Sequence, residues 1–292
     1  MNFIEIKYSS LKKYNTLKLE AKADLIVFPL NALGVKEVYL KYGKEKEIIV
    51  IGKGSNILLS KIYYDKKYVF LNLKLMDSVE FVGSKIFIEA GATLSSLSWY
   101  ALENNVQGYE FLEDVPGTLG GAVVMNAGTY ENNIGQLIDS ITYYNIEQEE
   151  VVSENVSVRD FGRRNSRYSD PNIIIISCLL FTKPGDYIES LNKLLEIKRN
   201  RYLKQPRNYP NAGSVFKRPI LNGKDYFVWK LFNDLELRGL KRRDAMISDK
   251  HPGFIVNTGS ATYEDIKYLI DVATDKVKKE FGIDLELEWK II

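Results

Sequence analysis

Small residues that could bring the backbone close to a ligand gather in residues 108–130, which read GYEFLEDVPGTLGGAVVMNAGTY. Pro116 fixes its own φ and lacks an N–H group, while Gly117, Gly120 and Gly121 allow backbone angles and close approaches that a Cβ would block. Such a loop can place backbone N–H groups against a phosphate or a flat ring. A tight turn between two buried strands is the structural alternative.

A second loop with phosphate-binding chemistry directly follows the apolar run at residues 47–51. It lacks the third glycine and the following helix of a dinucleotide-binding fingerprint, and it lacks the second glycine–lysine unit of a P-loop. A hairpin turn is therefore the alternative to a ligand contact here too. The loop comprises Gly52, Lys53, Gly54, Ser55 and Asn56.

Two further loops carry groups that could bind or protonate an anion. Residues 160–168 contain three arginines, among them Arg164, and such a cluster is usually solvated or paired with carboxylates. Ser214 lies in a turn shortly before Lys217 and Arg218. A serine in a turn is more often a cap than a catalyst, so the residue type alone does not assign a role.

The C-terminal residues alternate between apolar and polar types and predict a strand over residues 283–292. Glu288 and Lys290 share its polar face because successive side chains of a strand point to opposite sides. That face meets either solvent or a site. The only histidine, His251, has no cysteine or carboxylate-pair motif near it, so we expect no metal site.

Composition places the chain among ordinary globular proteins. It has 292 residues, a formal net charge of +2 and 45% hydrophobic residues, which leaves nothing that demands nucleic acid or an anionic membrane surface. The first residues show no signal-peptide pattern, and no run reaches the ~18 apolar residues of a membrane span. Cys178, the single cysteine, lies in an apolar run where a buried thiol is expected. A cytoplasmic, soluble protein is predicted.

The coarse pattern predicts alternating strands and helices with a change of character near residue 185. Strands are expected at residues 25–29, 47–51, 69–73, 79–82, 85–90, 138–145, 151–158 and 173–181, and helices at 32–42, 94–105, 186–203, 228–237 and 263–281. A domain boundary is placed where Lys183-Pro184-Gly185 precedes the long helix.

Taken together, the motifs resemble one family, the UDP-N-acetylenolpyruvoylglucosamine reductases (MurB) of bacterial peptidoglycan synthesis. Six ordered motifs carry the resemblance, which runs from about residue 15 to the last residue. They are GKGSNI at 52–57, VPGTLGGAVVMNAGTY at 115–130, FGRRNS at 161–166, GSVFK at 213–217, SDKHPGFIVN at 248–257 and ELEWK at 286–290.

The resemblance implies an α+β fold. It combines a two-part FAD-binding region of the vanillyl-alcohol-oxidase (PCMH) type with a separate α/β substrate-binding domain. On this basis residues 1–74 form FAD-binding subdomain 1, residues 75–185 form subdomain 2 joined by the C-terminal strand 284–292, and residues 186–283 form the substrate domain. The interval between Arg164 and Ser214 has no room for the long tyrosine loop of larger members, so the shorter subtype is expected.

The resemblance also implies a reaction in two halves. NADPH gives a hydride to FAD and leaves, and the flavin then delivers it to the enolpyruvyl group of UDP-N-acetylglucosamine enolpyruvate. Arg164 would be the cation at the substrate carboxylate, Ser214 the proton donor and Glu288 its acid–base partner. Lys217 and Arg218 are candidates for the UDP diphosphate. FAD would be held by Gly52, Lys53, Gly54, Ser55, Asn56, Pro116, Gly117, Thr118, Gly120, Gly121, Asn126 and Gly128.

Several positions depart from the family pattern without removing a residue assigned to chemistry. Arg163 replaces a common tyrosine, Asp114 a common glycine and Lys290 a tail arginine, while residues 243–244 and 20–21 replace two glycine pairs. These changes affect the expected shape of the flavin and substrate pockets, and the arginine at position 163 also affects the expected affinity for the substrate.

Two other functions remain open from the residues alone. One is a different FAD oxidase or dehydrogenase of the same flavin fold, against which the 213–217 loop and the Glu288 tail argue. The other is a non-catalytic protein that binds a nucleotide sugar or flavin, which would have no need of a proton donor. A monomer is expected, without a nucleic-acid or membrane partner.

Overall fold

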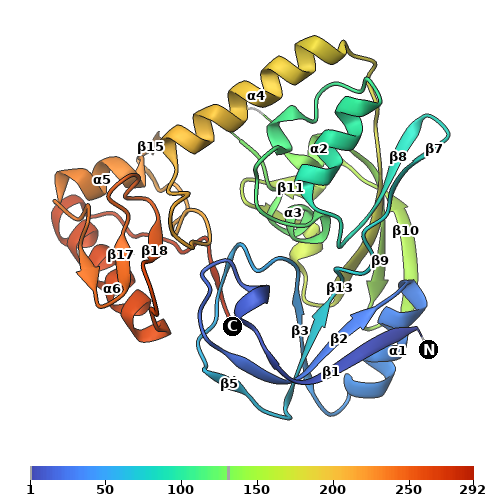
Figure 1. The fold of residues 1–292 in the computed structure, drawn as a ribbon, viewed down its shortest axis with the longest axis horizontal. Helices are drawn as coiled ribbons and strands as arrows, with labels where there is room; N and C mark the ends of the chain where they lie inside the picture. Colours follow the sequence, from blue (N-terminus) through green and yellow to red (C-terminus); the bar gives the residue numbers. More distant parts are fainter. Residues whose placement is uncertain (1, 130–131) are drawn as a thin grey trace. The chain divides into compact units, whose positions relative to one another are not determined.

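The computed structural model describes residues 2–129 and 132–292, and they form two compact units (Figure 1). The first unit comprises Met1–Ser9, Ala23–Lys53 and Asp65–Arg201, and the second comprises Ser10–Lys22, Gly54–Tyr64 and Tyr202–Ile292. Each unit is therefore assembled from segments that are far apart in the sequence. Tyr130, the last letter of the longest motif, lies outside the described residues.

The first sheet of unit 1 has the strand order β1-β2-β6-β3. Its strands are β1 (Phe3–Ser10), β2 (Lys22–Pro29), β6 (Tyr68–Asn72) and β3 (Glu47–Ile51). β6 pairs in parallel with both β2 and β3, and helix α1 (Ala32–Tyr42) makes the crossover between β2 and β3. Parallel strands need such a crossover connection. Because crossover helices cover the faces of a parallel sheet, its strands read as near-continuous apolar runs.

The second sheet of unit 1 is antiparallel, in the order β10-β9-β13-β8-β7. Its central strand is β13 (Ile173–Leu180), which is apolar except for the buried Ser177 and in which Cys178 is 2% exposed. The others are β7 (Val79–Val82), β8 (Lys85–Glu89), β9 (Ile138–Asn145) and β10 (Glu150–Asn155). Helices α2 (Leu94–Glu103) and α3 (Leu119–Met125) contribute apolar side chains to the same core.

Helix α4 (Tyr187–Lys204) is held to unit 1 by ion pairs along one face. Lys193 lies 3.4 Å from Glu110, and Lys198 lies 2.8 Å from Glu113, whose carboxylate is almost fully buried. Leu194, which lies between these two lysines in the sequence, is buried. Unit 1 includes the helix as far as Arg201.

Unit 2 has its own core, built around helix α6 (Tyr263–Phe281). Thr262 and Asp265 form a reciprocal capping box at its start, and Gly282 ends it in the left-handed conformation, as the sequence predicts. The unit's other elements are β4 (Ile57–Leu58), β5 (Tyr63–Tyr64), β14 (Ile220–Leu221), β15 (Lys224–Asp225), α5 (Val228–Asp234), β16 (Lys241–Arg242), β17 (Ala245–Ile247), β18 (Ile255–Asn257) and β19 (Lys290–Ile291).

Short elements join these larger ones. They are the 3₁₀ turns η1 (Lys12–Tyr14), η2 (Glu110–Leu112), η3 (Ile134–Gln136), η4 (Val158–Asp160) and η5 (Arg167–Ser169), and the hairpin of β11 (Phe161–Gly162) with β12 (Asn165–Ser166).

Most predicted elements are confirmed to within a few residues, but the predicted tail strand over residues 283–292 is wrong in extent. Only β19 is a regular strand, and it pairs in parallel with β4. Upstream of it Leu287 makes a single bridge with Phe216, so the alternating segment divides its pairing between two partners. Helix α3, which no prediction included, is built from residues of the glycine stretch. The division into two FAD subdomains and a substrate domain stays a prediction, because the two compact units follow other bounds.

Candidate functional site

In unit 1 the two glycine motifs meet. β3 runs directly into Gly52, whose carbonyl accepts a hydrogen bond from the Asn72 amide at 3.0 Å. A Cβ built on Gly52 would lie 2.5 Å from the Thr118 hydroxyl oxygen, which is too close for two non-bonded atoms. Gly52 is therefore a glycine because another loop of the site occupies the space of its side chain.

The loop of residues 116–121 is fixed by two backbone bonds to the segment after β8. The N–H groups of Leu119 and Gly120 donate to the carbonyls of Ala92 and Ala90, both at 2.9 Å. Within the described chain, the N–H groups of Gly117, Thr118 and Gly121 have no acceptor. These three N–H groups are open to an acceptor from a ligand, whereas those of Leu119 and Gly120 are already engaged, and their contact with a pyrophosphate stays a prediction.

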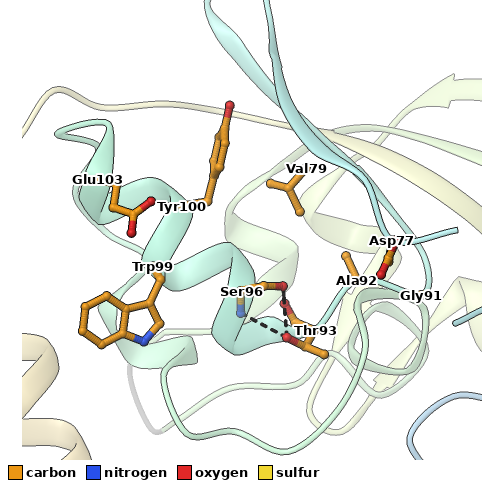
Figure 2. Close-up of a pocket in the computed structure, with 9 residues that line it drawn as sticks. All are labelled: Asp77, Val79, Gly91, Ala92, Thr93, Ser96, Trp99, Tyr100 and Glu103. Atoms are coloured by element: carbon orange, nitrogen blue, oxygen red, sulfur yellow. Dashed lines mark hydrogen bonds between the residues drawn. The ribbon is translucent and has the colours of Figure 1, made fainter. Parts of the chain in front are cut away.

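A cavity of about 460 Å³ lies beside this segment, at the start of α2 (Figure 2). Thr93 caps the helix, its hydroxyl accepting from the N–H of Ser96, and Trp99, Tyr100 and Glu103 stand along the helix (Figure 2). None of the residues predicted to bind a ligand lines this cavity.

Arg164 occupies the tight turn between β11 and β12 with φ of 54°, a left-handed conformation that is uncommon outside glycine. Its guanidinium donates to the carbonyl of Gly128 at 3.1 Å. Asn126, also left-handed at the end of α3, donates its amide to the carbonyl of Gly162 at 2.8 Å and accepts from the N–H of Gly135 at 3.2 Å. Asn126 and Gly128, predicted to bind the cofactor, thus hold the arginine hairpin in this structure.

In unit 2 the remaining part of the first glycine motif contacts the N-terminal turn and the C-terminal segment. A Cβ on Gly54 would lie 2.1 Å from the carbonyl oxygen of Tyr14. The Asn56 amide donates to the carbonyl of Glu288 at 2.9 Å, and the N–H of Lys290 returns a bond to the carbonyl of Asn56 at 3.0 Å. Gly54 and Asn56 therefore have structural partners, while Lys53 of unit 1 is exposed.

Unit 2 also brings Ser214 and Glu288 into neighbouring backbone segments. The N–H of Glu288 donates to the carbonyl of Val215 at 2.9 Å, and Val215 in turn donates to Gly253 at 3.0 Å. Ser214 is exposed and Glu288 half-buried, beside the buried Trp289. A hydroxyl and a carboxylate thus lie on adjoining backbone segments, and their roles as proton donor and acid–base partner stay predictions.

The two predicted diphosphate ligands have protein partners. Lys217 forms an ion pair with Glu286. Arg218 lies 3.6 Å from Asp225, and its guanidinium stacks 4.3 Å from the ring centre of Phe227. Both cations are partly exposed, and their contact with a diphosphate stays a prediction.

Arg201, whose side chain has a buried polar atom, was not among the site residues predicted from the sequence. Arg201 belongs to the basic end of α4, and its terminal nitrogen Nη1 is buried with no acceptor among the described residues. The spacing of Leu194, Lys198 and Arg201 would have placed it on the buried face of the helix. Among the described residues no helix is long and apolar enough to cross a membrane, and no cluster of three residues is suited to a metal ion.

Comparison with known proteins defines first a class of protein. Residues 23–150 match a model of an FAD binding domain, and residues 205–292 match the C-terminal domain model of UDP-N-acetylenolpyruvoylglucosamine reductase. The chain is an FAD-binding oxidoreductase, in which an FAD-binding domain is followed by the C-terminal domain of this reductase.

Similarity over the whole chain then identifies the family. The reductase of Caldicellulosiruptor bescii is 38% identical over 98% of this chain and 90% of its own length, and that of Thermotoga maritima is 32% identical over 97% of each. The crystal structure of the enzyme from Thermus caldophilus superposes with a TM-score of 0.80 at 27% identity, covering 100% of this chain and 99% of that one. The chain belongs to the UDP-N-acetylenolpyruvoylglucosamine reductase family.

Proposed function

We propose that this chain reduces UDP-N-acetylglucosamine enolpyruvate to UDP-N-acetylmuramate with NADPH and FAD, a step of peptidoglycan synthesis. The observation that supports it most strongly is similarity over nearly the full length of reductases of this name. A different FAD oxidase is disfavoured because the C-terminal domain, and not only the flavin region, matches the family.

Bound FAD would supply the transfer of a hydride from NADPH to the vinyl methylene carbon of the substrate. Negative charge then develops on the neighbouring carbon and on its carboxylate. A fixed cation stabilises that charge, and a nearby hydroxyl supplies the proton. We assign the cation to Arg164, the proton to the Ser214 hydroxyl and the acid–base partner to Glu288.

The protein residues that would hold FAD are those of the two glycine motifs. The N–H groups of Gly117, Thr118 and Gly121 would donate to the pyrophosphate, since they lack acceptors within the described chain. Gly52 would keep the first loop against Thr118. Asn126 and Gly128 contribute by holding Arg164, and Lys217 with Arg218 would exchange their carboxylate partners for the UDP diphosphate.

We further propose that the enzyme acts in the cytoplasm as a monomer, without a membrane partner. The substrate is a nucleotide sugar and the hydride donor is NADPH, both of which are soluble metabolites of that compartment. Sedimentation of the purified protein over a range of concentrations tests the monomer independently of activity.

The direct test of the function is substrate-dependent oxidation of NADPH by the purified, flavin-loaded protein. We expect NADPH absorbance to fall only when the enolpyruvyl sugar is present, with UDP-N-acetylmuramate as the product detected by mass spectrometry. Flavin that is reduced by NADPH but reoxidised only by oxygen would identify a different FAD oxidase and contradict the proposal.

A further inference from the structure

The buried face of helix α4 carries one charge that the fold does not satisfy. Ser190, Leu194, Lys198 and Arg201 follow one another at helical spacing along this face. Lys198 ends in a salt bridge, but the Arg201 guanidinium, one turn further along, has a buried Nη1 without an acceptor. A buried donor without a partner costs free energy, and a buried guanidinium costs more than a neutral group.

The negative charge of Glu113 raises the pKa of the Arg201 guanidinium, but this carboxylate already has other partners. Glu113 is 1% exposed, accepts a hydrogen bond from the Ser95 hydroxyl at 2.6 Å, and binds Lys198 at 2.8 Å. A single negative charge therefore serves two cations, Lys198 and Arg201. Among these three groups positive charge exceeds negative charge by one, which favours a further anion.

Arg164 is the second guanidinium of this neighbourhood. Burial, together with repulsion from Arg164, lowers the pKa of the Arg201 guanidinium below its usual range, while Glu113 opposes the shift. Arginine nevertheless stays protonated in proteins. Two like charges are thus held near each other inside unit 1, an arrangement that an anion bound to both would stabilise.

We propose that Arg201 and Arg164 form a two-guanidinium site for the carboxylate of the enolpyruvyl substrate, with Arg201 as a substrate-binding residue beyond those assigned above. This proposal rests on the proposed function. The planar guanidinium suits a carboxylate, to which it donates parallel hydrogen bonds. During the reaction the electron pair of the carbon–carbon π bond moves toward the carboxylate, whose negative charge rises from one toward two. A second cation therefore stabilises the later charge distribution more than the earlier one.

The test compares two ligands that differ only in the enolpyruvyl group. Binding of UDP-N-acetylglucosamine enolpyruvate and of UDP-N-acetylglucosamine to the flavin-loaded protein is measured by calorimetry for the wild type, Arg201→Met and Arg201→Lys. Arg199→Met is the matched control, because Arg199 lies on the exposed side of the same helix. We expect Arg201→Met to weaken the enolpyruvyl sugar by about 10- to 100-fold and to leave the simple sugar unchanged.

A second readout separates a binding role from a structural one. Because Arg201 lacks an internal partner for Nη1, Arg201→Met is expected to keep or raise the melting temperature, while Arg201→Lys restores part of the affinity. Equal weakening of both sugars, unchanged affinity for the enolpyruvyl sugar, or slower reduction of FAD by NADPH in Arg201→Met overturns the proposal. A wild-type protein that binds neither sugar overturns the proposed function itself.

Discussion

The position of Arg164 depends on contacts from the segment that follows helix α3. Its left-handed conformation costs free energy, and the turn persists because Asn126 and Gly128 bind the hairpin from the segment after α3. The buried Ser166 adds a bond from its hydroxyl to the carbonyl of Val124 at 3.1 Å. The motif at residues 115–130 thus holds the hairpin at residues 161–166 in place.

Ser214→Ala should separate the two half-reactions. If the hydroxyl only protonates the substrate carbanion, flavin reduction by NADPH stays nearly unchanged, and flavin reoxidation by the enolpyruvyl sugar slows by ~10²–10⁴-fold, as for loss of a general acid. Glu288→Gln should show the same asymmetry. Stopped-flow absorbance of the flavin measures each half alone. Equal slowing of both halves, or of neither, would return Ser214 to the role of a turn residue.

His251 should make unit 2 less stable in acid. Its Nδ1 accepts from the N–H of Gly253 at 3.2 Å and its ring packs against Phe254, and burial lowers the pKa of the imidazole below 6.5. The unfolded chain binds a proton near pH 6.5 and the folded one only at lower pH, so stability falls as pH drops below about 6.5.

Urea unfolding at pH 7.5, 6.5 and 5.5 measures this effect, with His251→Gln as the control that removes it. Since His251 is the single histidine of the chain, one imidazole NMR signal reports its titration directly. A midpoint above pH 6.5 in the folded protein would contradict the burial argument.

At the scale of elements, the contact between the β3 loop and the loop before α3 should control flavin binding. Gly52→Ala places a methyl group 2.5 Å from the Thr118 hydroxyl oxygen, so one of the two loops must move. We expect a folded protein with reduced flavin per chain, measured by absorbance alongside circular dichroism.

A double variant makes this prediction specific. Thr118→Ala removes the obstructing oxygen and leaves the Cβ of residue 118 at 3.5 Å, an ordinary contact, so Gly52→Ala with Thr118→Ala should recover flavin relative to Gly52→Ala alone. Thr118→Ala by itself is the reference. Failure of the second substitution to restore any flavin would show that the loss has another origin.

The sequence predicted elements better than it predicted contacts. α1, β3 and α6 follow from periodicity and caps, since these are local properties. Helix α3 was missed because its two glycines weaken the helical signal, and it is held by residues 90–92 of another segment. The tail strand was overextended because alternation shows which side chains share a face, but not which partner each residue pairs with.

The site was predictable to a similar degree. Motif order singled out Arg164, Ser214 and Glu288 as candidates whose roles stay predictions, whereas the contacts of Asn126 and Gly128 require the folded chain. Arg201 had a visible helical spacing, yet its missing partner depends on Glu113, which is 88 positions earlier in numbering and engaged with Lys198. Which charged side chains interact with one another cannot be predicted from their separation in the sequence.

At the scale of the whole molecule, the kinetics should show that the two substrates exclude each other. NADPH delivers its hydride to the flavin and the enolpyruvyl sugar takes it from the same flavin, so each substrate reacts with a different form of the enzyme. We expect parallel lines in double-reciprocal plots when both concentrations vary, the ping-pong pattern. Intersecting lines would require both ligands to be bound together.

The interleaving of segments in the two units also sets an order of events on the ribosome. Unit 1 can close once residue 201 has emerged, since none of its segments lies further along the chain. In unit 2, Ser60 and Tyr64 donate to the carbonyl of Ile292, and Leu17, Leu58 and Trp289 share one core. Throughout translation of the last third, the early segments of this core stay without their partner, exposing apolar surface that nascent-chain chaperones recognise.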